Sequence, residues 1–313
     1  MNGRKKRGAA CACSLALLGA LLCLLLCFPA CGGGDGREAV RSVYYWQTVF
    51  RLDSAQTDFL RRHKVTRMYL RYFDVADGRP NATLAFAQSV PEGLEVVPTV
   101  FVMPGTLRGD VRWYAEHIVR RVAQMNEVNG VRGVREVQID CDWTRSTRRA
   151  FTAFMEAVRA AARRRGWDTS VTIRLHQLSQ DPPPADRGVL MLYNTGDLRD
   201  PACRKPILDP ADVQPYLRSL GGYALPLAEV YPAFALNVLY RGGCFVGIVH
   251  YEGEYPVLPT DSLVRRAPAP GDIMATRRAV RRAGGRLTNE TIIYDLGSAN
   301  NFTESDYEKI YAD

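Results

Sequence analysis

Two acids at the end of an apolar run are the residues of this sequence best suited to chemistry. Asp140 and Asp142 lie near the end of the run Val134–Thr144, in which apolar residues alternate with polar ones. Alternation with a period of two predicts a strand whose two acids share one face. Acids on an otherwise buried strand are unfavourable unless they are paired, hydrated or used. We therefore expect the end of this strand to carry a functional site.

The pattern that follows this strand predicts a helix. Ser146 can cap it, and apolar residues recur at helical spacing from Ala150 to Val158. A strand, acids at its carboxyl end and then a helix form one sector of the active site in a (β/α) barrel.

The rest of the chain repeats this alternation of strand and helix. Strand patterns occur at Val43–Phe50, Val65–Val75, Leu94–Met103, Val134–Thr144, Ser170–Leu178, Gly188–Asn194, Ala224–Ala235 and Thr291–Leu296. About eight strands separated by helical segments predict a single (β/α)8 TIM-like barrel over residues 42–313. Residues 237–255 predict an extra pair of strands, joined through Arg241-Gly242-Gly243, that makes the barrel irregular. A doubly wound open sheet is the alternative, although no Gly-x-Gly-x-x-Gly motif supports it.

Barrel active sites collect at strand carboxyl ends, so these ends supply the candidate residues. The expected catalytic residues are Asp142 and Glu229, with Asp140 tuning the pKa of Asp142 through like-charge proximity. The expected substrate-binding residues are Trp46, Tyr72, His176, Tyr193, Asn194, Tyr231 and Asp295. Carboxylate pairs with aromatic rings suit glycosidic cleavage, in which one acid protonates the leaving oxygen. A generic barrel with polar strand ends would give a similar set.

Each candidate also has a structural interpretation. Asp140 is equally well explained as the ion-pair partner of Arg71 or Arg174 inside the barrel. Glu229 can be an ordinary carboxylate at a strand end, and the aromatic residues can be core packing. The sequence has only four histidines, which argues against a histidine-based metal centre, and no cofactor is expected.

Residues 1–30 have the composition of a targeting segment. Arg4–Arg7 is basic, Leu15–Phe28 is apolar, and Phe28-Pro29-Ala30-Cys31 resembles a lipobox. We therefore expect a lipoprotein signal peptide, lipidation at Cys31 and a flexible tether over residues 31–41, which together place the protein at the membrane of the cell envelope. An ordinary signal peptide cleaved nearby is the alternative.

The remaining composition excludes some classes of protein. Removal of four cations with residues 1–30 lowers the formal charge from +8 to +4. No aromatic-interleaved basic patch or nucleic-acid motif is present, so nucleic acid is not an expected partner. The cysteines outside residues 1–31 number three and show no Cys-x-x-Cys spacing, which predicts neither a disulfide framework nor a zinc site.

Two motifs resemble a known family. Asp140-Cys141-Asp142-Trp143 resembles the fourth-strand Asp-x-Asp-Trp-Glu motif of chitinase and endo-N-acetylglucosaminidase barrels. Met191-Leu192-Tyr193-Asn194 resembles their sixth-strand Met-x-Tyr-Asp motif. The resemblance implies that Tyr193 and Asn194 hold an acetamido group. The chain also resembles Bacteroidota lipoproteins that have no established reaction.

Thr144 departs from this family pattern, because it stands where the family has its catalytic Glu. A threonine hydroxyl cannot supply a proton at neutral pH. Three hypotheses follow: a cell-envelope glycoside hydrolase acting on a glycan, a glycan-binding barrel without catalysis, or an envelope scaffold without a ligand. Thr144 favours the second over the first, and the acid cluster favours the first over the third.

Overall fold

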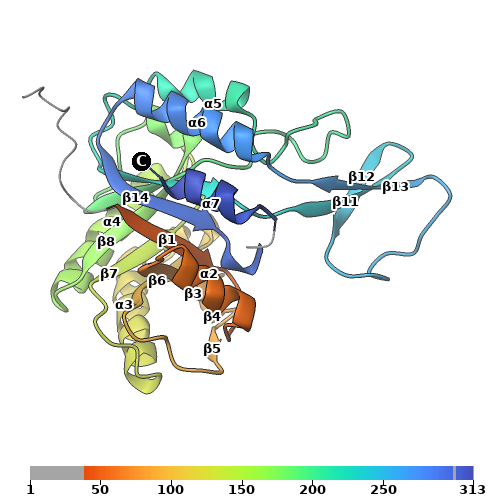
Figure 1. The fold of residues 1–313 in the computed structure, drawn as a ribbon. Coiled ribbons are helices and arrows are strands. Elements are labelled where there is room, and N and C mark those ends of the chain that lie inside the picture. The colour runs from red at the N-terminus through yellow and green to blue at the C-terminus, as the bar shows by residue number, and fades with distance from the viewer. Residues whose placement is uncertain (1–38, 299–300, 313) are drawn as a thin grey trace, which may run out of the picture. The chain divides into compact units, whose positions relative to one another are not determined.

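The computed structural model describes residues 39–298 and 301–312. Eight parallel strands close into a barrel (Figure 1). They are β1 (Val40–Tyr45), β3 (Arg67–Ala76), β6 (Glu95–Val102), β7 (Glu136–Asp140), β8 (Asp168–Arg174), β9 (Arg187–Met191), β10 (Leu227–Pro232) and β14 (Leu287–Tyr294). Each strand pairs with the next in this order, and β1 pairs with both β3 and β14. The predicted TIM-like barrel is therefore confirmed.

Helices connect most of these strands. They are α2 (Ser54–Arg62), α3 (Val111–Val128), α4 (Arg148–Arg163), α5 (Pro210–Leu217), α6 (Pro270–Ala283) and α7 (Glu304–Tyr311), with 3₁₀ turns η1 (Pro104–Arg108), η2 (Leu175–Ser179) and η3 (Leu296–Ser298). The connection from β3 to β6 instead holds β4 (Arg79–Asn81), which pairs with β3 outside the ring, and β5 (Ala85–Phe86), which pairs with β2 (Val49–Phe50). Residues 175–178, predicted as strand, belong to η2.

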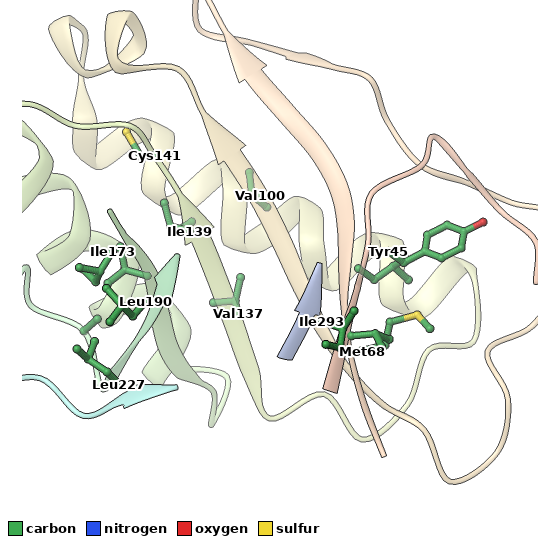
Figure 2. Close-up of a cluster of buried hydrophobic side chains, with 14 of the residues drawn as sticks. Tyr45, Met68, Val100, Val137, Ile139, Cys141, Ile173, Leu190, Leu227 and Ile293 are labelled. Atoms are coloured by element: carbon green, nitrogen blue, oxygen red, sulfur yellow. The ribbon is translucent and has the colours of Figure 1, made fainter. Parts of the chain in front are cut away.

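The outer faces of the barrel strands and the helices enclose one apolar core. Val137, Ile139 and Cys141 point into it from β7 and the residue after it, as the sequence alternation predicts (Figure 2). Burial raises the pKa of the Cys141 thiol, which behaves as a small apolar side chain. Helix α4, whose apolar face contains Phe151, Phe154 and Met155, covers this part of the sheet. The acids of the strand therefore face the barrel interior.

The barrel interior has two layers. Toward the middle lies a smaller apolar cluster, contributed by strands alone: Tyr44, Tyr69, Val97, Val189, Met191, Ala228, Val230 and Ile292. Below it, near the amino ends of the strands, lies a group of buried and partly buried polar residues, five of them charged, that we call the floor cluster: Ser42, Arg67, Glu95, Glu136, Arg187 and Glu290. Arg67 Nη1 lies 3.1 Å from Glu290 Oε2, and Arg187 bonds to both Glu290 and Glu136. The charges compensate one another, which makes their burial tolerable.

Between β10 and α6, the chain forms a three-stranded antiparallel sheet. Its strands are β11 (Leu236–Arg241), β12 (Cys244–Val249) and β13 (Asp261–Arg266), and β11 lies in the middle. The predicted pair of strands is present, and β13 adds a third beyond the predicted range. In Figure 1 this sheet extends to one side of the barrel.

The predicted signal peptide, lipobox and most of the tether lie outside the described residues. Within the described part of the chain, no helix is long and apolar enough to span a membrane.

Candidate functional site

One guanidinium bonds to both Asp140 and Asp142. Arg174, the last residue of β8, donates from Nε to Asp142 Oδ1 at 2.6 Å and from Nη2 to Asp140 Oδ1 at 3.1 Å. The hydroxyl of Thr172 also donates to Asp140, at 2.6 Å. Of the two arginines predicted to neutralise Asp140, Arg174 is the one that does so. Arg71 instead pairs with Asp74 on its own strand.

The two acids differ in burial. The Asp140 side chain is 7% exposed and that of Asp142 is 56% exposed. Burial raises the pKa of Asp140, although Arg174 and Thr172 act in the opposite direction. Burial acts to lower the pKa of Arg174, but Asp140 and other neighbours outweigh it, so the pKa rises. Asp140 is thus the buried support of the group, and Asp142 is the acid that a ligand can reach.

A pocket of about 420 Å³ opens beside this group. Its lining consists of Asp142, Thr144, Arg174, Leu175, His176, Met191, Tyr193, Asn194, Thr195 and Tyr216. Four of the predicted site residues therefore share one pocket: Asp142, His176, Tyr193 and Asn194. Asn194 has a positive φ of 55°, a conformation that asparagine tolerates better than most residues.

Aromatic rings form a continuous group next to the pocket. Tyr193 stacks on Tyr294 with ring centroids 5.0 Å apart, and Tyr294 contacts Trp46 at 5.9 Å. Burial raises the pKa of Tyr193, so its hydroxyl stays protonated and able to donate a hydrogen bond. Trp46 therefore adjoins the pocket through Tyr294 instead of lining it. Asp295 follows Tyr294, and burial raises its pKa as well.

Three of the predicted site residues face away from the pocket. Glu229 and Tyr231 lie on the outer face of β10, because Ala228 and Val230 occupy its inner face. The Tyr231 hydroxyl donates to Glu229 Oε1 at 2.8 Å, and Glu229 Oε2 lies 3.8 Å from Nε of Arg281 in α6. The prediction that Glu229 works opposite Asp142 in one cleft is therefore wrong.

Tyr72 is the third of these residues. It packs in the outer core, and its hydroxyl donates to Asn126 of α3 at 2.6 Å. A register shift between Arg71 and Phe73 in the pairing of β3 with β6 accompanies this orientation. The prediction that Tyr72 lines the mouth is also wrong.

Other lining residues were not predicted. Tyr216 comes from α5, Leu175 from η2 and Thr195 from the segment after β9. Tyr216 lies in a helix and not at a strand end, so only the packing of α5 against the barrel brings it to the pocket. Tyr294 was missed because the expected strand ran to Leu296, beyond the end of β14 at Tyr294, and Asp295 was the residue chosen from that end.

Thr144 lines the pocket, and its hydroxyl contacts two other hydroxyls. Its Oγ1 lies 2.9 Å from Ser146 Oγ, and its amide donates to Thr147 Oγ1 at 2.9 Å. Asp142 is consequently the sole carboxylate among the described lining residues. No group of three potential ligands in the described part of the chain could hold a metal ion.

Solved structures with similar barrels include a chitinase and two spore cortex-lytic enzymes. The chitinase from Chromobacterium violaceum ATCC 12472 aligns with a TM-score of 0.59 and 12% identity, over 88% of this chain and 100% of that chain. The spore cortex-lytic enzyme SleL aligns with TM-scores of 0.56 in Bacillus megaterium QM B1551 and 0.55 in Bacillus cereus, at 12% and 14% identity. These alignments cover 85% and 87% of this chain and 72% and 76% of the enzymes.

The chain shares its fold with these barrels. At such identity the likeness concerns the fold alone. No model of a protein family and no curated protein matches the chain.

Proposed function

We propose that this protein is a glycan-binding barrel that holds a saccharide without cleaving it. The observation that carries the proposal is the bridge from Arg174 to Asp140 and Asp142 beside a pocket with one accessible carboxylate. The pocket keeps a polar set suited to sugar hydroxyls, and the aromatic group beside it suits the apolar face of a pyranose.

The same geometry argues against hydrolysis. Two-carboxylate mechanisms place an acid and a base or nucleophile on opposite sides of the scissile bond. Here the second acid, Asp140, is buried behind Arg174, and the predicted partner Glu229 faces α6. Thr144 supplies a hydroxyl where a proton donor would be needed. The arrangement therefore supports binding better than bond cleavage.

The ligand class is a glycan that carries acetamido groups. Tyr193 and Asn194 resemble the residues that hold this group in the chitinase-like motif, and both line the pocket. Solved barrels of similar fold include a chitinase and spore cortex-lytic enzymes. These likenesses support the choice of N-acetylated oligosaccharides as the first probes.

The test combines binding and product release with the mature chain. We expect labelled N-acetylchitohexaose to bind without any increase in reducing ends. Tyr193→Ala should weaken binding by roughly 1–3 kcal/mol, through loss of stacking and a hydrogen bond. Tyr251→Ala is the matched control, because Tyr251 is 67% exposed in the segment after β12 and is not part of the pocket lining. Its binding should equal that of the parent.

Two results would overturn this proposal. Release of product that Asp142→Asn abolishes would make the protein a hydrolase. Absence of binding to every N-acetylated oligosaccharide tested would exclude the proposed ligand class.

We further propose that lipidation at Cys31 anchors the barrel to a membrane of the cell envelope. The support is the basic and apolar segment followed by a lipobox-like sequence. Cys31→Ser should release the protein from membranes or leave residues 1–30 uncleaved. Membrane fractionation that is unchanged by the substitution, together with a processed, unlipidated amino terminus in the parent, would refute the anchor.

A further inference from the structure

We propose that Trp113, on the first turn of α3, is a second saccharide-binding site, separate from the pocket. The ligand class rests on the proposed function, whereas the site itself rests on the geometry of α3. Trp113 is 50% exposed. The other three tryptophans are all buried to a greater degree, so this one is unusual in presenting its ring to solvent.

The Trp113 ring is held on one face. The imidazole of His117 stacks against it with ring centroids 3.6 Å apart and planes inclined by 23°. His117 is itself fixed, because its Nδ1 donates to the carbonyl oxygen of Trp113 at 2.7 Å. Tyr114 meets the indole edge-on at 5.3 Å. The ring is therefore supported from within the protein while half of the residue remains open.

The backbone beneath the ring is held as well. Asp110 Oδ1 accepts from the amides of Arg112 and Trp113, each at 3.0 Å. Tyr114 is wedged against Gly78 and Gly109, where a side chain in place of either hydrogen would collide with its ring. A ligand that stacks on Trp113 consequently has little motion to suppress, and preorganisation of this kind favours binding.

The exposed face of the Trp113 ring has the chemistry to bind a sugar ring. An indole presents a flat apolar surface with a polar N–H at its rim, and a pyranose with equatorial substituents presents a matching face of C–H groups. A flat ring that His117 supports on one face suits such a ligand.

Trp113 lies at the same end of the barrel as the pocket. Helix α3 follows β6 through η1, so its first turn lies at the carboxyl ends of the barrel strands. The Tyr114 contact with Gly78, in the turn between β3 and β4, agrees with this placement. The pocket residues also lie at strand carboxyl ends, on β8 and β9. Trp113 and the pocket therefore open on the same end of the barrel, where a long polysaccharide can contact both.

The experiment follows Trp113 directly. The mature chain is labelled with 5-fluorotryptophan, and the ¹⁹F resonance of Trp113 is assigned with Trp113→Phe. On titration with N-acetylchitohexaose, this resonance should shift in the parent and also in Tyr193→Ala, because the site does not depend on the pocket. The resonance of Trp167 is the internal control, since Trp167 precedes β8 at the opposite end of the barrel and should not move.

A retention assay measures the contribution of the site. Trp113→Ala should weaken retention on insoluble chitin by roughly 2–10-fold, as expected for loss of one stacking contact. Binding of N,N′-diacetylchitobiose to the pocket should be unchanged in this variant. His117→Ala, which removes the support but keeps the ring, should give a smaller loss.

The outcomes separate the two proposals. A stationary Trp113 resonance in a protein whose pocket binds sugar would overturn the second site and leave the proposed function intact. A Trp113 resonance that shifts in a protein whose pocket binds no sugar would support the second site and overturn the proposed function of the pocket. If neither responds, both proposals are wrong.

Discussion

At the scale of a single residue, Arg174 is the cation that neutralises the two acids beside the pocket. Arg174→Met would leave the carboxylate of Asp140 buried beside Asp142 with no cation at hydrogen-bonding distance. Removal of one partner from a buried pair leaves an uncompensated charge, so we expect a loss of roughly 3–5 kcal/mol in the free energy of unfolding at pH 7. Urea unfolding of parent and variant measures this difference.

A control and a pH series sharpen this test. Arg199→Met breaks an exposed pair with Asp197 and should change stability by less than about 1 kcal/mol. A carboxyl whose pKa is raised in the folded state favours folding when protonated, below its usual 3.8, and this contribution is lost as the pH rises through the folded pKa. The deficit of Arg174→Met should therefore shrink on acidification. An equal deficit at all pH values would contradict the assigned pairing.

Helix caps give a prediction at the scale of an element. Asp110 caps α3 through two amides, whereas α4 begins after Thr147 with no side-chain cap, although Ser146 was the predicted cap. Asp110→Ala should therefore lower the free energy of unfolding by about 0.5–2 kcal/mol. Ser146→Ala should change it by less than about 0.5 kcal/mol, as for an ordinary surface substitution. Thermal or urea unfolding of the two variants compares them, and equal losses would contradict the assignment.

The strands also show how far the sequence could predict this site. In β7 the alternation of apolar and polar residues is complete, and it predicted correctly which face carries Asp140. In β10 apolar residues occur on both faces, so Glu229 could not be assigned to a face from its position near the strand end. Apolar patterns identify buried strands well, but they do not determine the orientation of a strand that is apolar on both sides.

Other parts of the site depend on contacts between distant segments. The cap of α7 lies within one turn, where Thr303 and Asp306 bond reciprocally, so the local sequence contains the information for it. The pairing of β11 with β13 spans an intervening strand and loop, and the approach of Tyr216 to the pocket depends on the packing of α5. Local patterns contain no information about such contacts.

The floor cluster gives a prediction for the whole molecule, since its residues come from six of the eight barrel strands. Glu290→Gln would remove the carboxylate that Arg67 and Arg187 share, and the Glu290 side chain is only 3% exposed. We expect a loss of roughly 3–5 kcal/mol in the free energy of unfolding at neutral pH. Glu95→Gln, at the more exposed edge of the cluster, should give a smaller loss.

Acid unfolding provides a second measurement for the same residue. Burial acts to raise the pKa of Glu290, but Arg187 and Arg67 outweigh it and hold the pKa below its usual 4.5. The stability that Glu290 contributes is therefore present above pH 4.5 and is lost as the pH falls through the lower, folded pKa. The parent should lose more stability than Glu290→Gln in this acid range. Parallel pH profiles for the two proteins would contradict the role of this ion cluster.

The floor cluster also bears on how such a barrel can change over evolutionary time. Replacement of a whole buried ion cluster by apolar residues can leave stability unchanged, but each single replacement passes through a protein with a stranded charge. Substitutions at the floor are therefore opposed one at a time. At the mouth, exposed positions such as Asp142 and Thr144 can be exchanged singly at little risk to folding. Ligand recognition at the pocket can thus change by single substitutions during evolution, while the residues of the floor cluster stay the same.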